Sequence, residues 1–169
     1  MQNEAPIQDN DTIRTLPIIL AGLAGGLIEL IWIMLYSSVT PTSAIDVARQ
    51  ITVTVLPFTV GNGLAPALGV GIHLILSIML ATGFVAVLYG PIARRFGATG
   101  IFLSGLTTLS AVWAVNFFVL LPMLNPGFPL LMPYAVTLTS KLLFGAAMSW
   151  VLIRTNRTQP QRMVSVPSR

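Results

Sequence analysis

The chain has 169 residues, of which 54% are apolar and only 8% are charged. Soluble domains carry roughly a quarter of charged residues, so a chain of this size and composition could not cover a water-facing surface. Because it contains no cysteine, disulfides, a thiolate nucleophile and cysteine-ligated metal sites are excluded. The composition therefore predicts one domain embedded in lipid.

The net charge of +4 does not indicate a nucleic-acid partner, because the basic residues are not gathered into a patch of the folded domain. Four of the nine lie in the C-terminal tail, where arginines act as determinants of membrane orientation. These four are Arg154, Arg157, Arg162 and Arg169.

The first predicted span is residues 16–36. The first dozen residues of the chain are polar and acidic and lack the basic start of a cleavable signal peptide. The apolar stretch is long enough to cross a bilayer, so we expect an uncleaved helix. Gly22 and Gly26 form a small-xxx-small pair within it, which allows another helix to approach closely.

Residues 37–66 are expected to remain outside the bilayer core. Ser43 and Asp46 fit a capping box at a helix start, and Pro57 ends the helix. Its two faces differ, with apolar residues at helical spacing on one of them, namely Ala44, Val47, Ala48, Ile51 and Val55. We expect a short amphipathic helix in the interface plane, with a re-entrant dip over 51–66 as the alternative.

Three further spans are predicted at 68–90, about 100–121 and about 133–153. Pro91 should end the second span and begin a short loop over 91–99. The third and fourth spans are joined by an uncharged, proline-rich connection. An uncharged apolar segment outside the membrane is typical of an interface with another subunit.

The predicted fold is thus an all-α integral membrane protein, a four-transmembrane-helix bundle with a short amphipathic interfacial helix between helices 1 and 2. The membrane domain covers 16–153, preceded by the polar tail 1–15 and followed by a basic tail, 154–169, expected to be disordered.

Orientation follows from the arginines outside the spans. Seven of them fall on the side of the termini and the 91–99 loop, and only Arg49 falls on the other side. Because cytoplasmic loops carry the excess of Lys and Arg, both termini are predicted to lie in the cytoplasm.

Each predicted span carries one polar residue whose transfer into the bilayer costs free energy. These are Glu29, His73, Asn116 and Lys141. Such residues normally face the bundle interior and find partners, and at ~1.5 Å per residue all four lie about 8–12 Å below the outer surface. We therefore predict one polar layer, in which Glu29 and Lys141 form a buried ion pair while His73 and Asn116 satisfy the remaining hydrogen-bonding groups.

Two interpretations of this layer stay open. It can set helix register and pairing, or it can bind or relay a proton, a small ion or a polar ligand, with the titratable His73 at its centre. One histidine without cysteine offers too few ligands for zinc or a bis-histidine haem, so no metal or cofactor is expected.

No catalytic motif stands out. The sequence lacks G-x-S-x-G, H-E-x-x-H and a phosphate-binding glycine loop. Ser77 lies one helical turn from His73, but one serine–histidine spacing on a helix is weak support for a nucleophile, and we expect no enzymatic activity.

The chain resembles the YagU-like small bacterial inner-membrane proteins of unknown function. The resembling residues are the segment 73–77 of the second span, the end of the third span at 118–122, and Lys141 with Gly145 in the fourth. A histidine often stands in that family where this chain has Lys141. The resemblance implies a bacterial inner-membrane location and no defined role.

Two functions follow from the sequence. The first is a non-enzymatic accessory or scaffold subunit, or a homo-oligomer, because one thin polar layer in four helices leaves little room for an aqueous pathway. The alternative is a small proton- or ion-linked transporter using Glu29, His73 and Lys141. As a single chain it lacks the inverted repeat and broken helices of transporters, so such a unit would act as an oligomer.

Overall fold

The computed structural model describes residues 15–157, and this part of the chain is helical and contains no strand. The predicted N-terminal tail lies outside the described residues except for Thr15, which is the first helical residue. The predicted C-terminal tail begins too early, because the last helix continues through Arg157. Residues 158–169 lie outside the described part.

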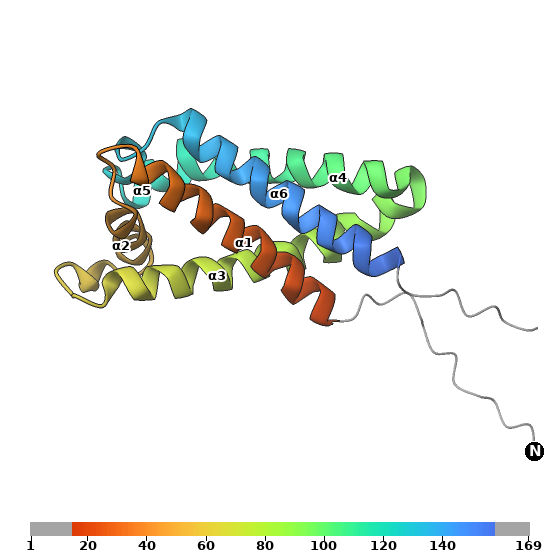
Figure 1. The fold of residues 1–169 in the computed structure, drawn as a ribbon, viewed down its shortest axis with the longest axis horizontal. Helices are drawn as coiled ribbons and strands as arrows, with labels where there is room; N and C mark the ends of the chain where they lie inside the picture. The colour runs from red at the N-terminus through yellow and green to blue at the C-terminus, as the bar shows by residue number, and fades with distance from the viewer. Residues whose placement is uncertain (1–14, 158–169) are drawn as a thin grey trace, which may run out of the picture.

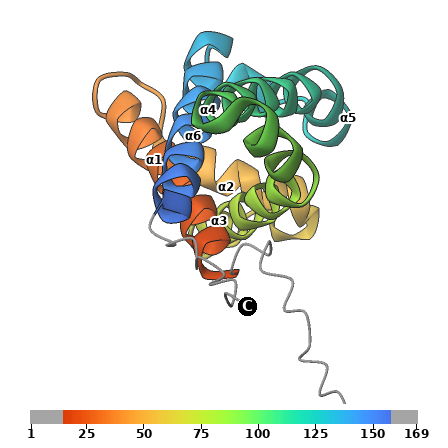
Figure 2. The same cartoon turned by 90° about the vertical axis from the view of Figure 1, so that its right-hand side faces the viewer.

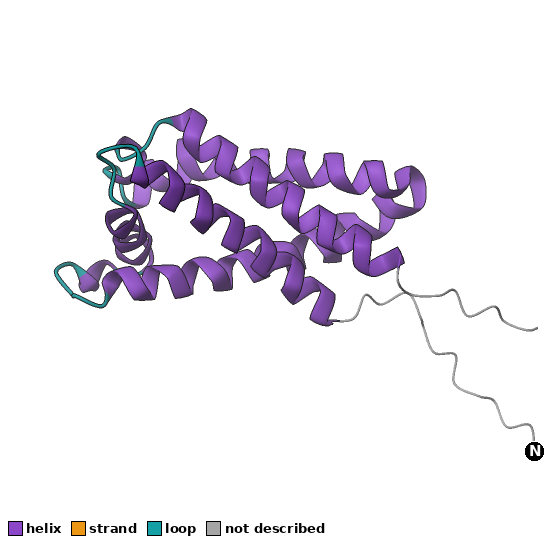
Figure 3. Ribbon diagram, in the orientation of Figure 1, coloured by secondary structure: helices purple, strands orange, loops and turns teal. Residues whose placement is uncertain are grey.

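Helices follow one another with short connections (Figures 1 and 3). In chain order they are α1 (Thr15–Ser38), α2 (Ala44–Val55), the 3₁₀ turn η1 (Pro57–Thr59), α3 (Ala65–Phe84), the π-helical η2 (Val85–Tyr89), α4 (Gly90–Val115), the π-helical η3 (Asn116–Leu120), α5 (Leu121–Leu124), the 3₁₀ turn η4 (Phe128–Leu130) and α6 (Tyr134–Arg157).

Three helical stretches are long and apolar enough to cross a membrane: Thr15–Ser38, Ala65–Leu124 and Tyr134–Thr155. The middle stretch of 60 residues is interrupted at Gly97, whose backbone has φ 59° and ψ −150°. Because glycine lacks a Cβ, it adopts this conformation at little cost. The chain turns there, and α4 runs back in the opposite direction to α3 (Figure 1).

The prediction of a loop over 91–99 is therefore wrong for most of these residues. Helix continues from η2 through Pro91 and includes Arg94 and Arg95, and only Gly97 leaves the helical conformation. Proline in a helix clashes with the carbonyl four residues earlier. Here that carbonyl belongs to Val87, which lies within the π-helical η2.

The same arrangement recurs near the other end of α4. Pro122 follows η3, and the carbonyl that its ring would meet belongs to Phe118 in that π-helical segment. A π-helical turn is wider than an α-helical turn, so in both places the helix accommodates the proline by widening instead of ending. Sequence rules that treat proline as a helix stop miss this solution.

The long helices pack in the order α3, α1, α6, α4. Extensive contacts join α1 to α3 and to α6, and α6 to α4, whereas α3 and α4 do not pack along their length. Figure 2, which looks along the bundle, shows α3 and α4 on separate sides with α2 crossing near α3. The bundle is therefore open between two of its helices.

Glycines bring α1 close to α3, as the small-xxx-small pair predicts. A Cβ on Gly22 would lie 2.6 Å from the Cα of Ile78, and one on Gly26 would lie 2.7 Å from the Oγ of Ser77. At Gly22 the backbones of α1 and α3 therefore lie closer together than they could if this residue had a side chain.

The other helix crossings also depend on glycine. A Cβ on Gly145 of α6 would lie 2.8 Å from the carbonyl oxygen of Gly105 on α4. A Cβ on Gly69 of α3 would lie 1.9 Å from the carbonyl oxygen of Ala48 on α2. A Cβ on Gly25 of α1 would lie 2.7 Å from the Phe144 ring on α6, so each of the four packed helix pairs is in contact at a glycine.

The tightly packed core lies in one half of the bundle. Its buried side chains come from the start of α1, the end of α3 with η2, the middle of α4 and α6 from Phe144 onward, and they include Phe84, Ile101, Leu109, Met148 and Leu152. α1 begins and α6 ends at the same end of the bundle as the turn between α3 and α4 (Figure 1). The opposite half holds the polar residues described below.

Candidate functional site

A cavity of about 1150 Å³ occupies the half of the bundle where α3 and α4 diverge. Its walls are mostly apolar and come from α1, α3, α4 and α6, while α2 and α5 contribute to one end. Typical small-molecule sites measure roughly 300–1,000 Å³, so this space is large enough for a lipid-sized molecule. The sequence predicted little room for an aqueous pathway inside one chain, and it did not predict this largely apolar space between α3 and α4.

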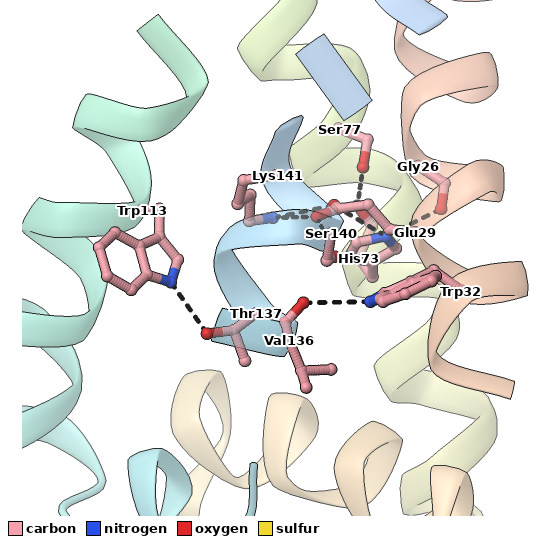
Figure 4. A network of polar contacts seen from close by, with 10 residues as sticks. All are labelled: Gly26, Glu29, Trp32, His73, Ser77, Trp113, Val136, Thr137, Ser140 and Lys141. Atoms are coloured by element: carbon pink, nitrogen blue, oxygen red, sulfur yellow. Dashed lines mark hydrogen bonds and ion pairs between the residues drawn. The ribbon is translucent and has the colours of Figure 1, made fainter. Parts of the chain in front are cut away.

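Glu29 is the most deeply buried ionisable residue of this site, with 2% of its surface exposed. The hydroxyl of Ser140 donates a 2.7 Å hydrogen bond to Oε1, and the Lys141 Nζ lies 2.8 Å from both Oε1 and Oε2. Figure 4 shows these contacts between α1 and α6. The predicted ion pair between Glu29 and Lys141 is confirmed, and neighbouring residues of α6 hold both carboxylate oxygens.

Lys141 is less buried than its partner and lines the cavity, with 19% of its side chain exposed. Its Nζ also lies 5.7 Å from the centre of the Phe144 ring, where the ring's π electrons attract a cation. Because an ammonium group has three donors and one carboxylate faces it, Lys141 retains a donor that can face the cavity.

His73 lies next to the ion pair of Glu29 and Lys141, but it is closer to a backbone carbonyl than to the carboxylate. Its Nε2 is 3.2 Å from the carbonyl oxygen of Gly26 and 3.6 Å from Glu29 Oε2. If Nε2 carries the proton, it donates to the Gly26 carbonyl. The carboxylate is therefore satisfied by Ser140 and Lys141, and His73 serves mainly to join α3 to α1.

Ser77 does not act on the imidazole. Its hydroxyl donates a 2.7 Å hydrogen bond to the backbone carbonyl of His73 (Figure 4), as serines in membrane helices commonly do. The Ser77 side chain thus packs against Gly26, where α1 and α3 lie close together. It is not arranged with His73 as a nucleophile and base.

Asn116 is the predicted layer residue that stays apart from the others. It is half-buried on the cavity wall, and within the described residues 15–157 its side-chain amide has no hydrogen-bond partner. The prediction that it satisfies groups of the ion pair is wrong. It lies on η3, on the side of the cavity formed by α4, and the divergence of α3 and α4 separates it from His73.

The sequence did not single out three further contacts. Besides Ser140, the indole nitrogen of Trp113 donates to the Thr137 hydroxyl at 2.9 Å, and that of Trp32 donates to the Val136 carbonyl at 3.1 Å (Figure 4). Each tryptophan lies three residues from a polar layer residue in the same continuous helical stretch. A buried indole N–H needs an acceptor, and that requirement was the available signal.

α2 has its apolar face turned toward the cavity. The residues predicted to contact lipid, Ala44, Val47, Ala48, Ile51 and Val55, all line that space. The capping prediction is confirmed in part, since the Ser43 hydroxyl accepts a 3.3 Å hydrogen bond from the Asp46 amide. The Asp46 side chain instead pairs with Arg49 on the exposed face.

The loop between α5 and α6 holds α2 in this position. The side-chain amide of Asn125 donates to Gln50 Oε1 at 2.8 Å and is 3.0 Å from Thr54 Oγ1. The Thr42 hydroxyl also lies 3.4 Å from the Leu131 carbonyl. These contacts join α2 to the opposite side of the bundle and cover one end of the cavity with protein.

Among the described residues, no group of three or more His, Cys, Asp and Glu side chains is arranged to hold a metal ion. The arrangement does offer one polar cluster, with a carboxylate and an ammonium of opposite charge, on the wall of an otherwise apolar cavity. No family model, curated protein or solved structure matches the chain.

Proposed function

We propose that this chain is a non-enzymatic, multi-pass protein of the bacterial cytoplasmic membrane that binds a lipid-class molecule in the cavity between α3 and α4. The observation that carries the proposal is the cavity itself, a largely apolar space of about 1150 Å³ between two helices that do not pack against each other.

In this proposal the chain crosses the membrane four times, with α3 and α4 as separate crossings joined at Gly97. A straight helix of 60 residues would measure about 90 Å at 1.5 Å per residue, about three times the hydrocarbon thickness. The non-helical backbone of Gly97 divides it into two lengths that are each long enough to cross a bilayer.

The orientation in this proposal places both termini in the cytoplasm. Arg94 and Arg95 lie in the helical turn before Gly97, at the end of the bundle where α1 begins and α6 ends. Arg49 lies on α2 at the opposite end. This distribution satisfies the positive-inside rule, and the bacterial location rests on the resemblance to YagU-like proteins.

A lipid-class occupant is favoured over water by the chemistry of the walls. The cavity is lined by Leu, Ile, Val, Met and Phe side chains over most of its surface, and an apolar cavity of this kind does not hold ordered water well. α2 and α5 cover one end, so the space between α3 and α4 is the side from which a molecule dissolved in the bilayer would enter.

A second candidate is an accessory or scaffold role, in which a helix of another subunit or of a second copy occupies the same space. The unpaired inner faces of α3 and α4 favour it, because helices in membranes normally find a packing partner. A proton- or ion-linked transporter using Glu29, His73 and Lys141 is less favoured, since Glu29 is already satisfied by Ser140 and Lys141.

The experiment that tests the proposal uses two glycines of α3. A Cβ on Gly83 or on Gly71 would meet no atom within 4 Å, but only Gly83 lines the cavity. Gly83→Phe should therefore fill part of the cavity, and Gly71→Phe is the matched control on the same helix.

The chain and both variants would be purified in mild detergent and weighed by native mass spectrometry. We expect the unchanged chain and Gly71→Phe to retain a lipid-sized molecule at one per chain, and Gly83→Phe to lose it. Retention of a partner protein at fixed stoichiometry would favour the accessory role, and equal lipid retention by all three proteins would contradict the proposal.

A further inference from the structure

We infer that the cavity selects an amphipathic molecule whose polar groups are uncharged and form hydrogen bonds, such as the hydroxyl and carbonyl groups of a neutral lipid, and that Asn116, Thr108 and Lys141 bind separate polar atoms of this molecule. The inference rests on the proposed function and names the chemical class of the ligand.

Two polar side chains of the cavity wall are left without hydrogen bonds inside the described part of the protein. Most polar side chains that line it have partners within the protein, including Thr54, Ser77 and Thr137. Thr108 and Asn116 line it as well, yet neither side chain has a hydrogen-bond partner within residues 15–157.

The contrast with neighbouring hydroxyls makes Thr108 unusual. Thr107 and Ser110 on the same helix donate to the carbonyls four residues earlier, Leu103 and Leu106, at 2.9 Å each. In a bilayer the backbone is the acceptor normally available to such a hydroxyl. A threonine that faces the cavity without this bond keeps its hydroxyl available for another molecule.

Asn116 offers both a donor and an acceptor at its amide. It is the first residue of η3 and lies two turns beyond Thr108 on the same helical face, with Val112 between them. At 1.5 Å per residue the two positions are about 12 Å apart along the axis. They can therefore contact two separate polar atoms of one elongated molecule.

The charges that line the cavity balance each other. Glu29 and Lys141 carry opposite charges at 2.8 Å, so with a neutral His73 the polar cluster has no net charge. Within the described residues, Lys141 and Glu29 are the charged side chains that line the cavity. A phosphate or free carboxylate would bring an uncompensated charge into a low-dielectric site, which is costly.

Lys141 and Asn116 then supply donors from opposite sides of the same space. The Lys141 ammonium retains a donor beyond those used by Glu29, and the Asn116 amide has both its N–H groups available. Such donors suit carbonyl and hydroxyl oxygens, which diacylglycerols and isoprenoid quinones, among other membrane molecules, carry without charge.

The test measures binding of defined lipids to the purified full chain in detergent by native mass spectrometry. The probes are a diacylglycerol, an isoprenoid quinone and the anionic phosphatidylglycerol. We expect at least one neutral probe to bind about tenfold more tightly than phosphatidylglycerol, and the comparison of the two neutral probes identifies the source of the polar group.

The variants Asn116→Leu and Thr108→Val should each weaken binding of that neutral probe about three- to tenfold, since each removes about one hydrogen bond. Thr107→Val is the matched control, because Thr107 is exposed and does not line the cavity, and it should leave binding unchanged. Both cavity variants replace a polar group with an apolar one in the membrane and should fold.

The outcomes separate the two proposals. Tight binding of phosphatidylglycerol, or unchanged binding by Asn116→Leu and Thr108→Val, would overturn the inference about the polar group while the Gly83→Phe variant still lowers lipid binding. If no probe binds, or if Gly83→Phe binds every probe as the unchanged chain does, the proposed function itself fails.

Discussion

The ammonium of Lys141 lies 2.8 Å from both carboxylate oxygens of Glu29, so an ion pair joins the first and the last long helix of the chain. The pair is almost completely buried on the Glu29 side and faces the cavity on the Lys141 side. It therefore both fixes the packing of α1 against α6 and forms the polar part of the cavity wall.

The ion pair gives the first prediction. Glu29→Gln should destabilise the fold by about 3–5 kcal/mol, because it leaves the Lys141 charge unpaired in a low-dielectric site. The double variant Glu29→Gln with Lys141→Met should lose less than Glu29→Gln alone. Folded yield and thermal unfolding in detergent measure both effects.

The exposed pair of Asp46 and Arg49 on α2 is the control for that cycle. Asp46→Asn should change stability by less than about 1 kcal/mol, since water screens exposed ion pairs. Additive losses for the two replacements of Glu29 and Lys141 would contradict the importance of their pairing.

The glycine contacts give the second prediction. Gly22→Ala should lower stability by about 1–3 kcal/mol, because the new Cβ would lie 2.6 Å from backbone of Ile78 and force α1 and α3 apart. Gly71→Ala, in open space on α3, should be neutral or stabilising by about 0.5–1 kcal/mol, as expected for glycine to alanine in a helix. Equal thermal midpoints for the two variants would argue against close packing at Gly22.

The proposed orientation gives the third prediction. Because the chain contains no cysteine, a single introduced cysteine reports its own location. Arg49→Cys should react with a membrane-impermeant maleimide in intact cells whose outer membrane is permeable to the reagent, and Arg95→Cys should react only after the cytoplasmic membrane is disrupted. Labelling of both positions from the same side would contradict a crossing by α3 or the location of α2 outside.

The attachment of α2 gives the fourth prediction. Asn125→Ala removes the hydrogen bonds to Gln50 and Thr54, so α2 should lose protection from hydrogen exchange while α6 keeps its own. Asn62→Ala is a control that changes a different loop, where the Asn62 side chain accepts from the Leu64 amide. Unchanged exchange over 44–55 in Asn125→Ala would show that packing against α3 alone holds α2.

The features that could be predicted from the sequence depend on local patterns or on strong physical constraints. Long apolar segments, the capping serine and the close approach at Gly22 all follow from residue type and spacing. The partnership of Glu29 with Lys141 follows because neither charge can stay alone in lipid. With few charges available, the pairing had few alternatives.

The features that could not be predicted depend on how far the helices diverge. Residues at equal depth were expected to meet, but Asn116 lies on the far side of a cavity that no local pattern encodes. Ser140 could not be distinguished from the other serines, because its importance comes only from its position beside Glu29. The π-helical segments before Pro91 and Pro122 likewise follow from tertiary accommodation and not from the usual rule for proline.

The occupant of the cavity is the central claim, and cross-linking from inside the cavity tests it most directly. A photoreactive side chain at Val112 lines the cavity, and one at Leu103 on the same helix is exposed outside it. After irradiation in native membranes, Val112 should form an adduct of lipid mass dominated by one species, and Gly83→Phe should abolish it. Leu103 should capture the mixed bulk lipids regardless of Gly83→Phe. A protein adduct at Val112, or a mixture of lipids identical to that at Leu103, would contradict a selective lipid-binding cavity.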